Sequence, residues 1–585
     1  MPRRNWLSWF LAALSAACGL FLIVVALLPY GSMKALADSL MPDGNFTSLK
    51  AGNAGVFRGL LGAGGVAFLG LAALTVLRRW GLVLSFFKQF WADARRFFAA
   101  LRPHKDEPGF LAALLVIMTL AVIYRLEYIY SSLHHDEAYT YVAFAHSLFA
   151  AATDYHLPNN HVFHSILVYF STQLFGIQPW AVRLPAFTAG VLLVPAAYWL
   201  AKRLYDRWTA LGAALLVTFF PALIGYSTNA RGYTLVALFS LLTMALGDVV
   251  RKEKNLFAWG LISLFSALGF YSVPVMLFPF GVLFVWLFFE NQISGLGPYR
   301  TKWDFICHWL AAGLGTAFLT VLFYLPIMVY TGPQKLFASG FVAPLPWANL
   351  LETLVQRFAE TWAEWSFRLP PAVIILLAAG WTLSLVFHRR LSATRLPLQL
   401  AALLWIVVLL IVQRPNAWSK VWVFLQPLVL IWAAAGTLGL LRNIRLNFGR
   451  GVPLVAVVFG LALLAGLWRA ARLVPELPEL WAARGDEERA VLFVQSQLQA
   501  GDLIVVAPPD DAPVWYYSEL HGIADVHFDF EAAFARALVM VDPAEGQTPA
   551  SVIQERGPDP GDLDLDACEL LDVFGKVQVF DCPRK

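Results

Sequence analysis

The 585-residue chain is 59% hydrophobic and only 14% charged, with a mean hydropathy of +0.63. This composition excludes a soluble globular protein and indicates a protein that crosses a membrane many times. The net charge of +4 is unevenly divided, because residues 473–585 carry 22 acidic and 7 basic residues. We therefore predict a basic, all-α polytopic membrane domain followed by an acidic soluble domain, with no nucleic-acid partner.

The first hundred residues are predicted to form two membrane-spanning helices and a basic connection. The apolar run 7–30 follows Pro2-Arg3-Arg4 and, at about 24 residues, is too long for the core of a signal peptide. A second span over 56–76 contains Gly62-Ala63-Gly64-Gly65, small residues that let a neighbouring helix approach closely. The basic and aromatic stretch 78–105 fits either an amphipathic helix on the cytoplasmic membrane face or a basic loop.

A third span over 110–130 begins the main membrane domain. Short apolar stretches at 142–151 and 162–175 fit helices that lie along the surface. Ten further spans bring the expected total to about thirteen: 183–201, 209–226, 233–250, 256–271, 273–289, 305–330, 371–387, 397–412, 421–441 and 452–468.

The basic residues orient these spans. Clusters of Lys and Arg fall in alternate loops, and the positive-inside rule places those loops in the cytoplasm. The N-terminus is then cytoplasmic, and the C-terminal domain lies on the outer side of a plasma (inner) membrane. The loops that carry the clusters are 202–207, 251–254, 300–302, 388–395 and 442–450.

The C-terminal domain is predicted to be a small α/β domain. Helical spacing over 485–499 and 515–521 alternates with strand-like runs at 502–507, 537–541 and 577–580. Cys568 and Cys582 both fall here and could pair in an oxidising compartment. The expected domains are 1–105, a core over 106–470 with outer loops 131–182 and 331–370, and 471–585.

The polar segment that follows the third span is the first candidate site. It contains His134-His135-Asp136-Glu137 and, twenty residues later, His156-Leu157-Pro158-Asn159-Asn160-His161. Polar groups at a membrane boundary are costly to place, which indicates a functional site, although an ordinary hydrated loop is the alternative. Arg231 and Lys420 also lie where the chain enters the membrane from outside. Such cations suit a phosphate, or they extend to lipid headgroups.

The ordered motifs Asp136-Glu137-Ala138-Tyr139, Pro158–His161, Phe175-Gly176 and Trp180–Pro185 resemble those of bacterial family 39 glycosyltransferases. These are relatives of protein O-mannosyltransferases and of the aminoarabinose transferase that acts on lipid A. The resemblance covers about 110–468 and leaves the first two spans as an addition. It implies a C-type glycosyltransferase fold, a polyprenyl-phosphate-linked sugar donor, and Asp136 as the catalytic carboxylate. Many relatives carry Lys-Pro-Pro where this chain has Leu157-Pro158-Asn159-Asn160-His161, and an Arg-Tyr pair before the last core span where this chain has Trp418-Ser419-Lys420.

The chemistry of such a transfer leads to assigned roles. A carboxylate at a partly desolvated boundary can take the proton of an acceptor hydroxyl, so we assign Asp136 as the base and Glu137 to orient the site through His135 or a surface helix. The phosphate leaving group needs cations and hydrogen-bond donors. We expect Arg231, Lys420, Asn229 and Tyr233 on the donor phosphate, and His156, Asn159, Asn160 and His161 on the acceptor.

No cofactor or metal is required for this reaction, although Asp136, His156 and His161 could form a metal site. From the resemblance we expect the donor to be a hexosyl or pentosyl polyprenyl phosphate and the acceptor to be an envelope lipid, glycan or protein. A transporter or flippase of lipid-linked sugars is the main alternative, and a non-catalytic scaffold is another. Spans almost free of central charges and the lack of an internal sequence repeat favour the enzyme.

Overall fold

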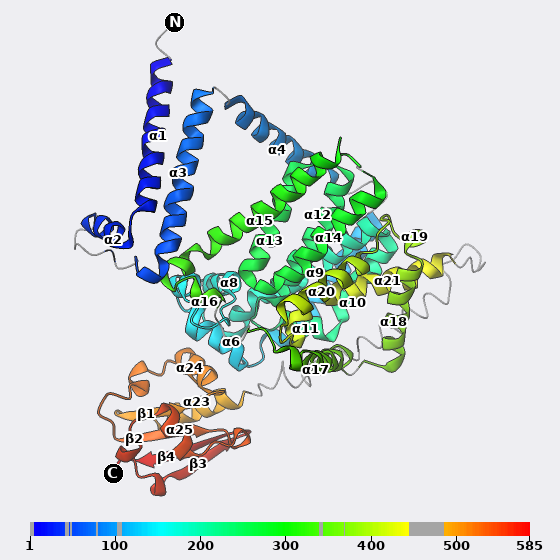
Figure 1. Cartoon of the computed structure of the whole chain (residues 1–585). Helices are drawn as coiled ribbons and strands as arrows, with labels where there is room; N and C mark the ends of the chain where they lie inside the picture. Colours follow the sequence, from blue (N-terminus) through cyan, green and yellow to red (C-terminus); the bar gives the residue numbers. More distant parts are fainter. Residues whose placement is uncertain are drawn as a thin grey trace.

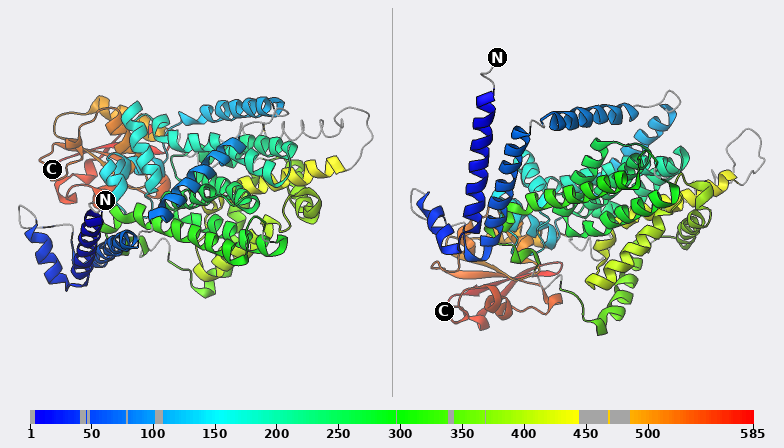
Figure 2. Two further views of the ribbon diagram at one scale, coloured as in Figure 1. Left: turned by 90° about the horizontal axis from the view of Figure 1, so that it is seen from above. Right: turned by 45° about the horizontal axis from the view of Figure 1, so that its top comes forward.

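The computed structural model describes residues 5–40, 46, 49–77, 80–101, 108–295, 297–337, 343–367, 369–443, 468 and 485–585. A bundle of helices forms the larger part, and a small sheet with three helices forms the C-terminal part. Figure 1 shows the C-terminal part at one end of the bundle and helix α4 (Trp80–Ala100) at the other. The right-hand view in Figure 2 shows the same separation.

Helices α1 (Asn5–Leu27) and α3 (Ala54–Val76) form a hairpin that stands beside the bundle (Figure 1). Glycine permits the close approach predicted for this pair, because a Cβ at Gly65 would lie 2.8 Å from the carbonyl oxygen of Gly19. The short helix α2 (Tyr30–Ser39) connects them. Helix α4 exposes Phe86, Phe87 and Trp91, which agrees with an amphipathic helix.

The centre of the bundle is formed by helices that are apolar on every side. Helix α12 is buried over almost its whole length, as expected for a helix without a polar face. The bundle helices are α5 (Pro108–Ile129), α6 (His135–Tyr139), α7 (Leu148–Thr153), α8 (Val162–Phe175), α9 (Pro179–Leu204), α10 (Arg207–Phe219), α11 (Pro221–Ser227), α12 (Tyr233–Lys252), α13 (Leu256–Ser272), α14 (Leu277–Ser294), α15 (Lys302–Tyr330), α16 (Gln334–Phe337), α17 (Trp347–Ser366), α18 (Pro371–Val386), α19 (His388–Leu391), α20 (Leu398–Gln413) and α21 (Leu425–Asn443).

Short irregular turns complete the bundle. A π-helix over Thr140–Ala145 continues α6, and 3-10 turns occupy Ala51–Asn53, Pro274–Met276 and Ser419–Trp422.

Seven of the described helices are long and apolar enough to cross a membrane, or nine if each of two bent pairs forms one span. This is fewer than the thirteen spans predicted. Apolar helices do occur at the predicted spans 256–271, 397–412 and 421–441; their described apolar parts are Leu256–Ser272, Leu398–Gln413 and Leu425–Leu438. The predicted span 452–468 lies almost entirely outside the described residues.

The C-terminal part contains a four-stranded sheet in the order β1-β2-β4-β3. Strands β1 (Asp502–Val506) and β2 (Arg536–Val541) are parallel, and helix α24 (Asp511–Leu520) lies in the crossover between them. Strand β4 (Val577–Pro583) runs antiparallel to β2 and to the edge strand β3 (Glu569–Phe574). Helices α23 (Asp486–Gln497) and α25 (Pro549–Arg556) complete the predicted α/β domain. Sequence analysis found β1, β2 and β4 but missed β3, which is largely exposed.

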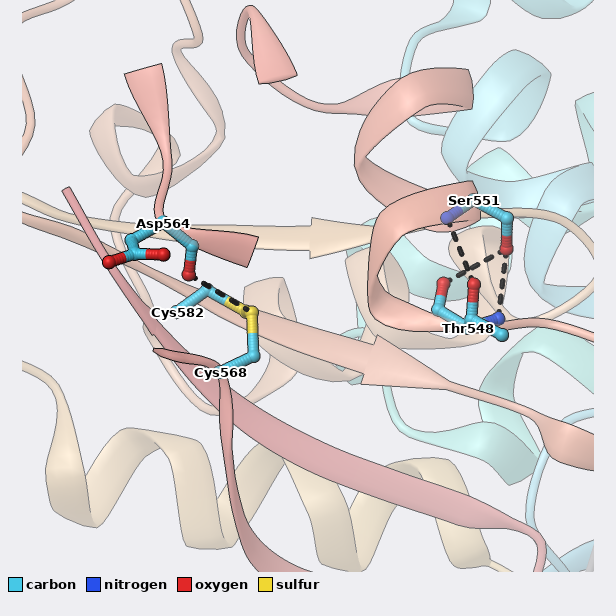
Figure 3. Close-up of a disulfide and its surroundings, with 5 residues drawn as sticks. All are labelled: Thr548, Ser551, Asp564, Cys568 and Cys582. Carbon is cyan, nitrogen blue, oxygen red and sulfur yellow. Dashed lines mark hydrogen bonds between the residues drawn. A yellow bond between two sulfur atoms is a disulfide. The ribbon is translucent and has the colours of Figure 1, made fainter. Parts of the chain in front are cut away.

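Cys568 and Cys582 form a disulfide, a pairing that the sequence left open. Figure 3 shows how this disulfide joins strand β4 to the segment that follows Asp564. The same view shows Thr548 and Ser551, whose reciprocal hydrogen bonds cap the start of α25.

Candidate active site

Asp136 lies in the first turn of α6, and two cations face its carboxylate. Arg231 Nη2 is 3.9 Å and Lys420 Nζ is 3.8 Å from Asp136 Oδ2. The three residues are spread over nearly three hundred positions of the sequence, so only the folded chain brings them together. The Asp136 side chain keeps 36% of its exposure and therefore remains open to a ligand.

The two cations control the charge of Asp136. Burial raises the pKa of this carboxyl, but Arg231, Lys420 and, more weakly, His134 and His135 lower it, with a net result of about 2. Asp136 is therefore ionised at neutral pH. An ionised carboxylate can accept a proton from an acceptor hydroxyl.

Arg231 is buried and held by the segment that contains Asp136 and Asn159. Its Nη1 donates hydrogen bonds to the carbonyl oxygens of Asp136 (3.4 Å) and Asn159 (3.2 Å) and to Thr140 Oγ1 (3.2 Å), and its Nη2 donates to Asn159 Oδ1. Its Nε has no hydrogen-bond partner among the described residues. The guanidinium thus has a fixed position and a donor to spare for an anion.

His161 lies behind Arg231 as a neutral ring. Its Nδ1 accepts a hydrogen bond from the Gly232 amide at 2.9 Å, so the proton of the neutral imidazole is on Nε2, 3.4 Å from Arg231 Nη2. Burial and the charge of Arg231 hold the His161 pKa well below its usual value. The edge of Tyr233 packs on the ring at 4.9 Å between centroids.

The other predicted site residues differ in position. Asn160 is buried, donates to the carbonyl oxygens of Ala151 and Asp154 and accepts from Ser165, so its amide holds the loop together. His156 is 45% exposed and contacts Asp154 (2.7 Å) and Tyr139 (2.9 Å) at the rim of the site. Asn229 is buried, and its carbonyl oxygen accepts the Arg231 amide at 2.7 Å.

Glu137 forms a buried ion pair that sequence analysis did not foresee. Its two oxygens accept two parallel hydrogen bonds from Arg183 at 2.8 and 2.7 Å, and also accept the amides of Ala230 (2.6 Å) and His134 (3.0 Å). Both side chains are at most 2% exposed. Glu137 thus joins α6 to α9 and to the loop before Arg231. The predicted bond to His135 is absent among the described contacts; His135 Nδ1 instead lies 2.6 Å from the Pro509 carbonyl oxygen.

The C-terminal domain braces the loop that carries Asp136. The Leu133 amide donates to Tyr517 Oη at 2.8 Å, and Tyr141 Oη donates to Glu519 Oε1 at 2.8 Å. Leu133 and Tyr141 also share one buried apolar cluster with Tyr517. The domain therefore fixes the chain on both sides of Asp136.

Tyr517→Phe is expected to loosen this loop. The change leaves the buried Leu133 amide without its acceptor, which costs about 1–3 kcal/mol. Hydrogen exchange of the Leu133 amide, measured by mass spectrometry on peptides from 131–141, should accelerate by roughly tenfold or more. Tyr130→Phe is the matched control, since Tyr130 is 65% exposed. Unchanged protection in Tyr517→Phe would show that this contact does not hold the loop.

The metal site considered for Asp136, His156 and His161 does not form. Across the described ranges, no group of three His, Cys, Asp or Glu side chains is arranged to hold a metal ion.

Comparisons with known proteins agree with the predicted resemblance. Residues 158–297, which include His161 and Arg231, match the family described as dolichyl-phosphate-mannose-protein mannosyltransferase. Crystal structures of ArnT from Cupriavidus metallidurans, in the apo state and bound to undecaprenyl phosphate, superpose with a TM-score of 0.51 in each case. They are 12% and 13% identical in sequence, and each alignment covers 81% of this chain and 97% of ArnT. No curated protein sequence matches this chain.

The chain therefore has the C-type glycosyltransferase fold and resembles the O-mannosyltransferases and the aminoarabinose transferase, as predicted.

Proposed function

We propose that this chain is an integral membrane glycosyltransferase that moves a hexosyl or pentosyl group from a polyprenyl phosphate to an envelope acceptor outside the cytoplasm. The observation that carries the proposal is the ionised Asp136 carboxylate facing Arg231 and Lys420 within a multi-pass helical bundle. A carboxylate beside two cations provides a base and an anion site in one place. ArnT, which shares the fold, has been crystallised with undecaprenyl phosphate bound.

The reaction is a direct displacement at the anomeric carbon. Asp136 takes the proton of the acceptor hydroxyl as its oxygen attacks the sugar, and the bond from the anomeric carbon to the phosphate oxygen breaks. The polyprenyl phosphate leaves with that electron pair as an anion, stabilised by Arg231 and Lys420. A single displacement inverts the configuration at that carbon.

Donor binding also strengthens the base. Arg231 and Lys420 hold the Asp136 pKa near 2 in the free protein. A phosphate placed against these cations offsets their charge and raises the Asp136 pKa, so the carboxylate becomes a better proton acceptor once the donor is bound.

The remaining site residues surround these three. Asn229 and Tyr233 support the donor side, since the Asn229 carbonyl oxygen accepts the Arg231 amide and Tyr233 packs against the His161 ring beside Arg231. On the acceptor side we place the exposed His156, with Asn159 and His161 behind it. Asn160 serves this side through the fold of its loop.

We also propose the topology that this chemistry needs. Residues 1–105 add a hairpin and a cytoplasmic linker, 106–470 form the transferase core with thirteen spans in the whole chain, and 471–585 form an outer domain. An alkaline phosphatase fused after Lys585 is expected to be active, because that enzyme folds only where disulfides form, and a green fluorescent protein fused there should stay dark. The reverse result would contradict the orientation and the assigned site.

Arg231→Ala is expected to weaken use of the donor. Loss of a charge-assisted contact to the phosphate costs roughly 1.5–3 kcal/mol, so kcat/KM for a polyprenyl-phosphate sugar should fall about tenfold or more. The assay uses protein in detergent, where a transporter would yield no product. Arg556→Ala, in the C-terminal domain, is the control for loss of an exposed guanidinium elsewhere in the chain, since its side chain is 52% exposed. Unchanged kinetics in Arg231→Ala would leave this residue as a headgroup anchor.

A further inference from the structure

Helix α17 carries a continuous apolar stripe on its outer surface. Trp347, Leu351, Val355, Phe358 and Trp362 recur every three or four residues, so they share one side of the helix. They are between 50% and 74% exposed. A row of large apolar side chains this exposed marks an interaction surface, in contrast to single exposed residues, which are common.

Two other faces of α17 define how the helix lies. Glu352 and Gln356 are exposed on an adjoining polar face, whereas Leu350, Arg357 and Thr361 turn toward the protein. A helix with one protein-facing, one apolar and one polar side is suited to the boundary between membrane and water.

The neighbouring helix indicates what covers the apolar stripe. Helix α17 meets α18, part of the apolar bundle, at a bend of 114°. Helix α18 likewise exposes large apolar side chains, Ile375 and Val386, each at 68%, as expected of a membrane-bundle helix whose outer side faces lipid. Figure 1 shows α17 near α11, at the end of the bundle where the C-terminal part lies.

The protein-facing side of α17 connects with the active site. The Arg357 guanidinium lies over the ring of Trp418, 3.2 Å from its centroid, and Arg357 Nε donates to Asn416 Oδ1 at 2.7 Å. Before α17, the Leu345 amide donates to the Arg414 carbonyl oxygen at 2.8 Å. These contacts hold the segment that ends at Lys420, the cation 3.8 Å from Asp136.

We propose that the apolar stripe of α17 docks on the outer leaflet of the lipid bilayer and that Arg357, through Trp418 and Asn416, positions Lys420 opposite Asp136. The second part rests on the proposed function, because it takes Lys420 as a contact to the donor phosphate. The Lys420 side chain is 42% exposed, and its Nζ faces Asp136. Its backbone lies in the short 3-10 turn Ser419–Trp422, so the position of this turn sets the direction of the side chain. The contact of Arg357 with Trp418, two residues before Lys420, would restrict the movement of this turn.

The docking is tested without any activity measurement. Cys18 and Cys307 are the free cysteines of the described chain. In a Cys18→Ser, Cys307→Ser background, a nitroxide is attached at Val355→Cys or, as the matched control one residue on, at Gln356→Cys. In liposomes, the label at 355 should collide more with oxygen than with a water-soluble nickel complex, and the label at 356 should show the reverse. High nickel access at both positions, or low access to both reagents at 355, would exclude lipid as the cover.

The positioning role is tested by a double-mutant cycle on the donor KM. Lys420→Ala should raise the donor KM about tenfold, and Arg357→Ala should raise it by a smaller factor with the acceptor KM unchanged. If Arg357 acts through Lys420, adding Arg357→Ala to Lys420→Ala should have no further effect. Trp418→Phe, which keeps an aromatic face, should behave like the wild type, whereas Trp418→Ala should follow Arg357→Ala.

The outcomes distinguish a failure of the proposed function from a failure of the positioning role of Arg357. An unchanged donor KM in Lys420→Ala would contradict the proposed function. A raised KM in Lys420→Ala with no effect of Arg357→Ala, or with additive effects in the double variant, would contradict the positioning role alone.

Discussion

Asp136→Asn is expected to lower the turnover of sugar transfer by roughly 10²–10⁴-fold, the range for loss of a general base. The amide has the size of the carboxylate but cannot take the acceptor proton. Donor binding should persist or become tighter, because the variant removes a negative charge that lies between Arg231 and Lys420, where the phosphate binds. A fall in kcat without a rise in the donor KM is therefore the result that identifies a base.

The pH dependence offers a second measurement of the same group. Transfer needs the ionised carboxylate, so activity is lost as the pH falls through the Asp136 pKa. That pKa is about 2 in the free protein, and bound donor raises it. The acid limb of kcat should consequently lie at higher pH than that of kcat/KM, since kcat reports the bound state.

The assay uses a defined polyprenyl-phosphate sugar, with the anomeric configuration of the product read by NMR. Asp572→Asn, on the exposed edge strand β3, is the matched control for an amide replacing a carboxylate. Near-normal turnover in Asp136→Asn, or a product that retains the configuration of the donor, would contradict the mechanism.

The local sequence predicted the individual elements better than their pairing. Apolar runs such as 233–250 stand out, because a helix buried on all sides has no polar face to interrupt the pattern. The continuous apolar strands β1 and β2 stand out for the same reason. Strand β3 was missed because Glu569 and Asp572 interrupt an edge strand that has no buried face to specify.

For the candidate site, too, the sequence predicted individual residues better than the contacts between them. Asp136, Arg231 and Lys420 could be named as candidates from sequence because few charged residues adjoin the spans outside the basic clusters. Arg183 lies within the Trp180–Pro185 motif, but the sequence did not predict its role as the partner of a buried carboxylate. Its pairing with Glu137, and the contact of Tyr517 with Leu133, join segments 46 and 384 positions apart, and no local pattern encodes such a distance.

Glu137→Gln is expected to act mainly on stability, by about 3–5 kcal/mol, as for other buried ion pairs that lose one charge. The two Glu137 oxygens accept four hydrogen bonds, from Arg183 twice and from the amides of His134 and Ala230. A glutamine offers one oxygen and an NH2 group, so two of these donors would face another donor. Arg183 would also remain buried without a counter-charge.

The matched measurement compares thermal unfolding in detergent with turnover per folded molecule. Glu137→Gln should unfold at a clearly lower temperature than the wild type, while Glu352→Gln, on the exposed side of α17, should not. The folded fraction should lose less turnover than Asp136→Asn, because Glu137 acts on the site through the backbone amides of His134 and Ala230, which neighbour Asp136 and Arg231. In a double-mutant cycle, Glu137→Leu with Arg183→Leu should be less destabilised than the sum of the single changes, since no unpaired charge remains. Wild-type stability combined with a turnover loss as large as that of Asp136→Asn would instead make Glu137 a member of the reacting group.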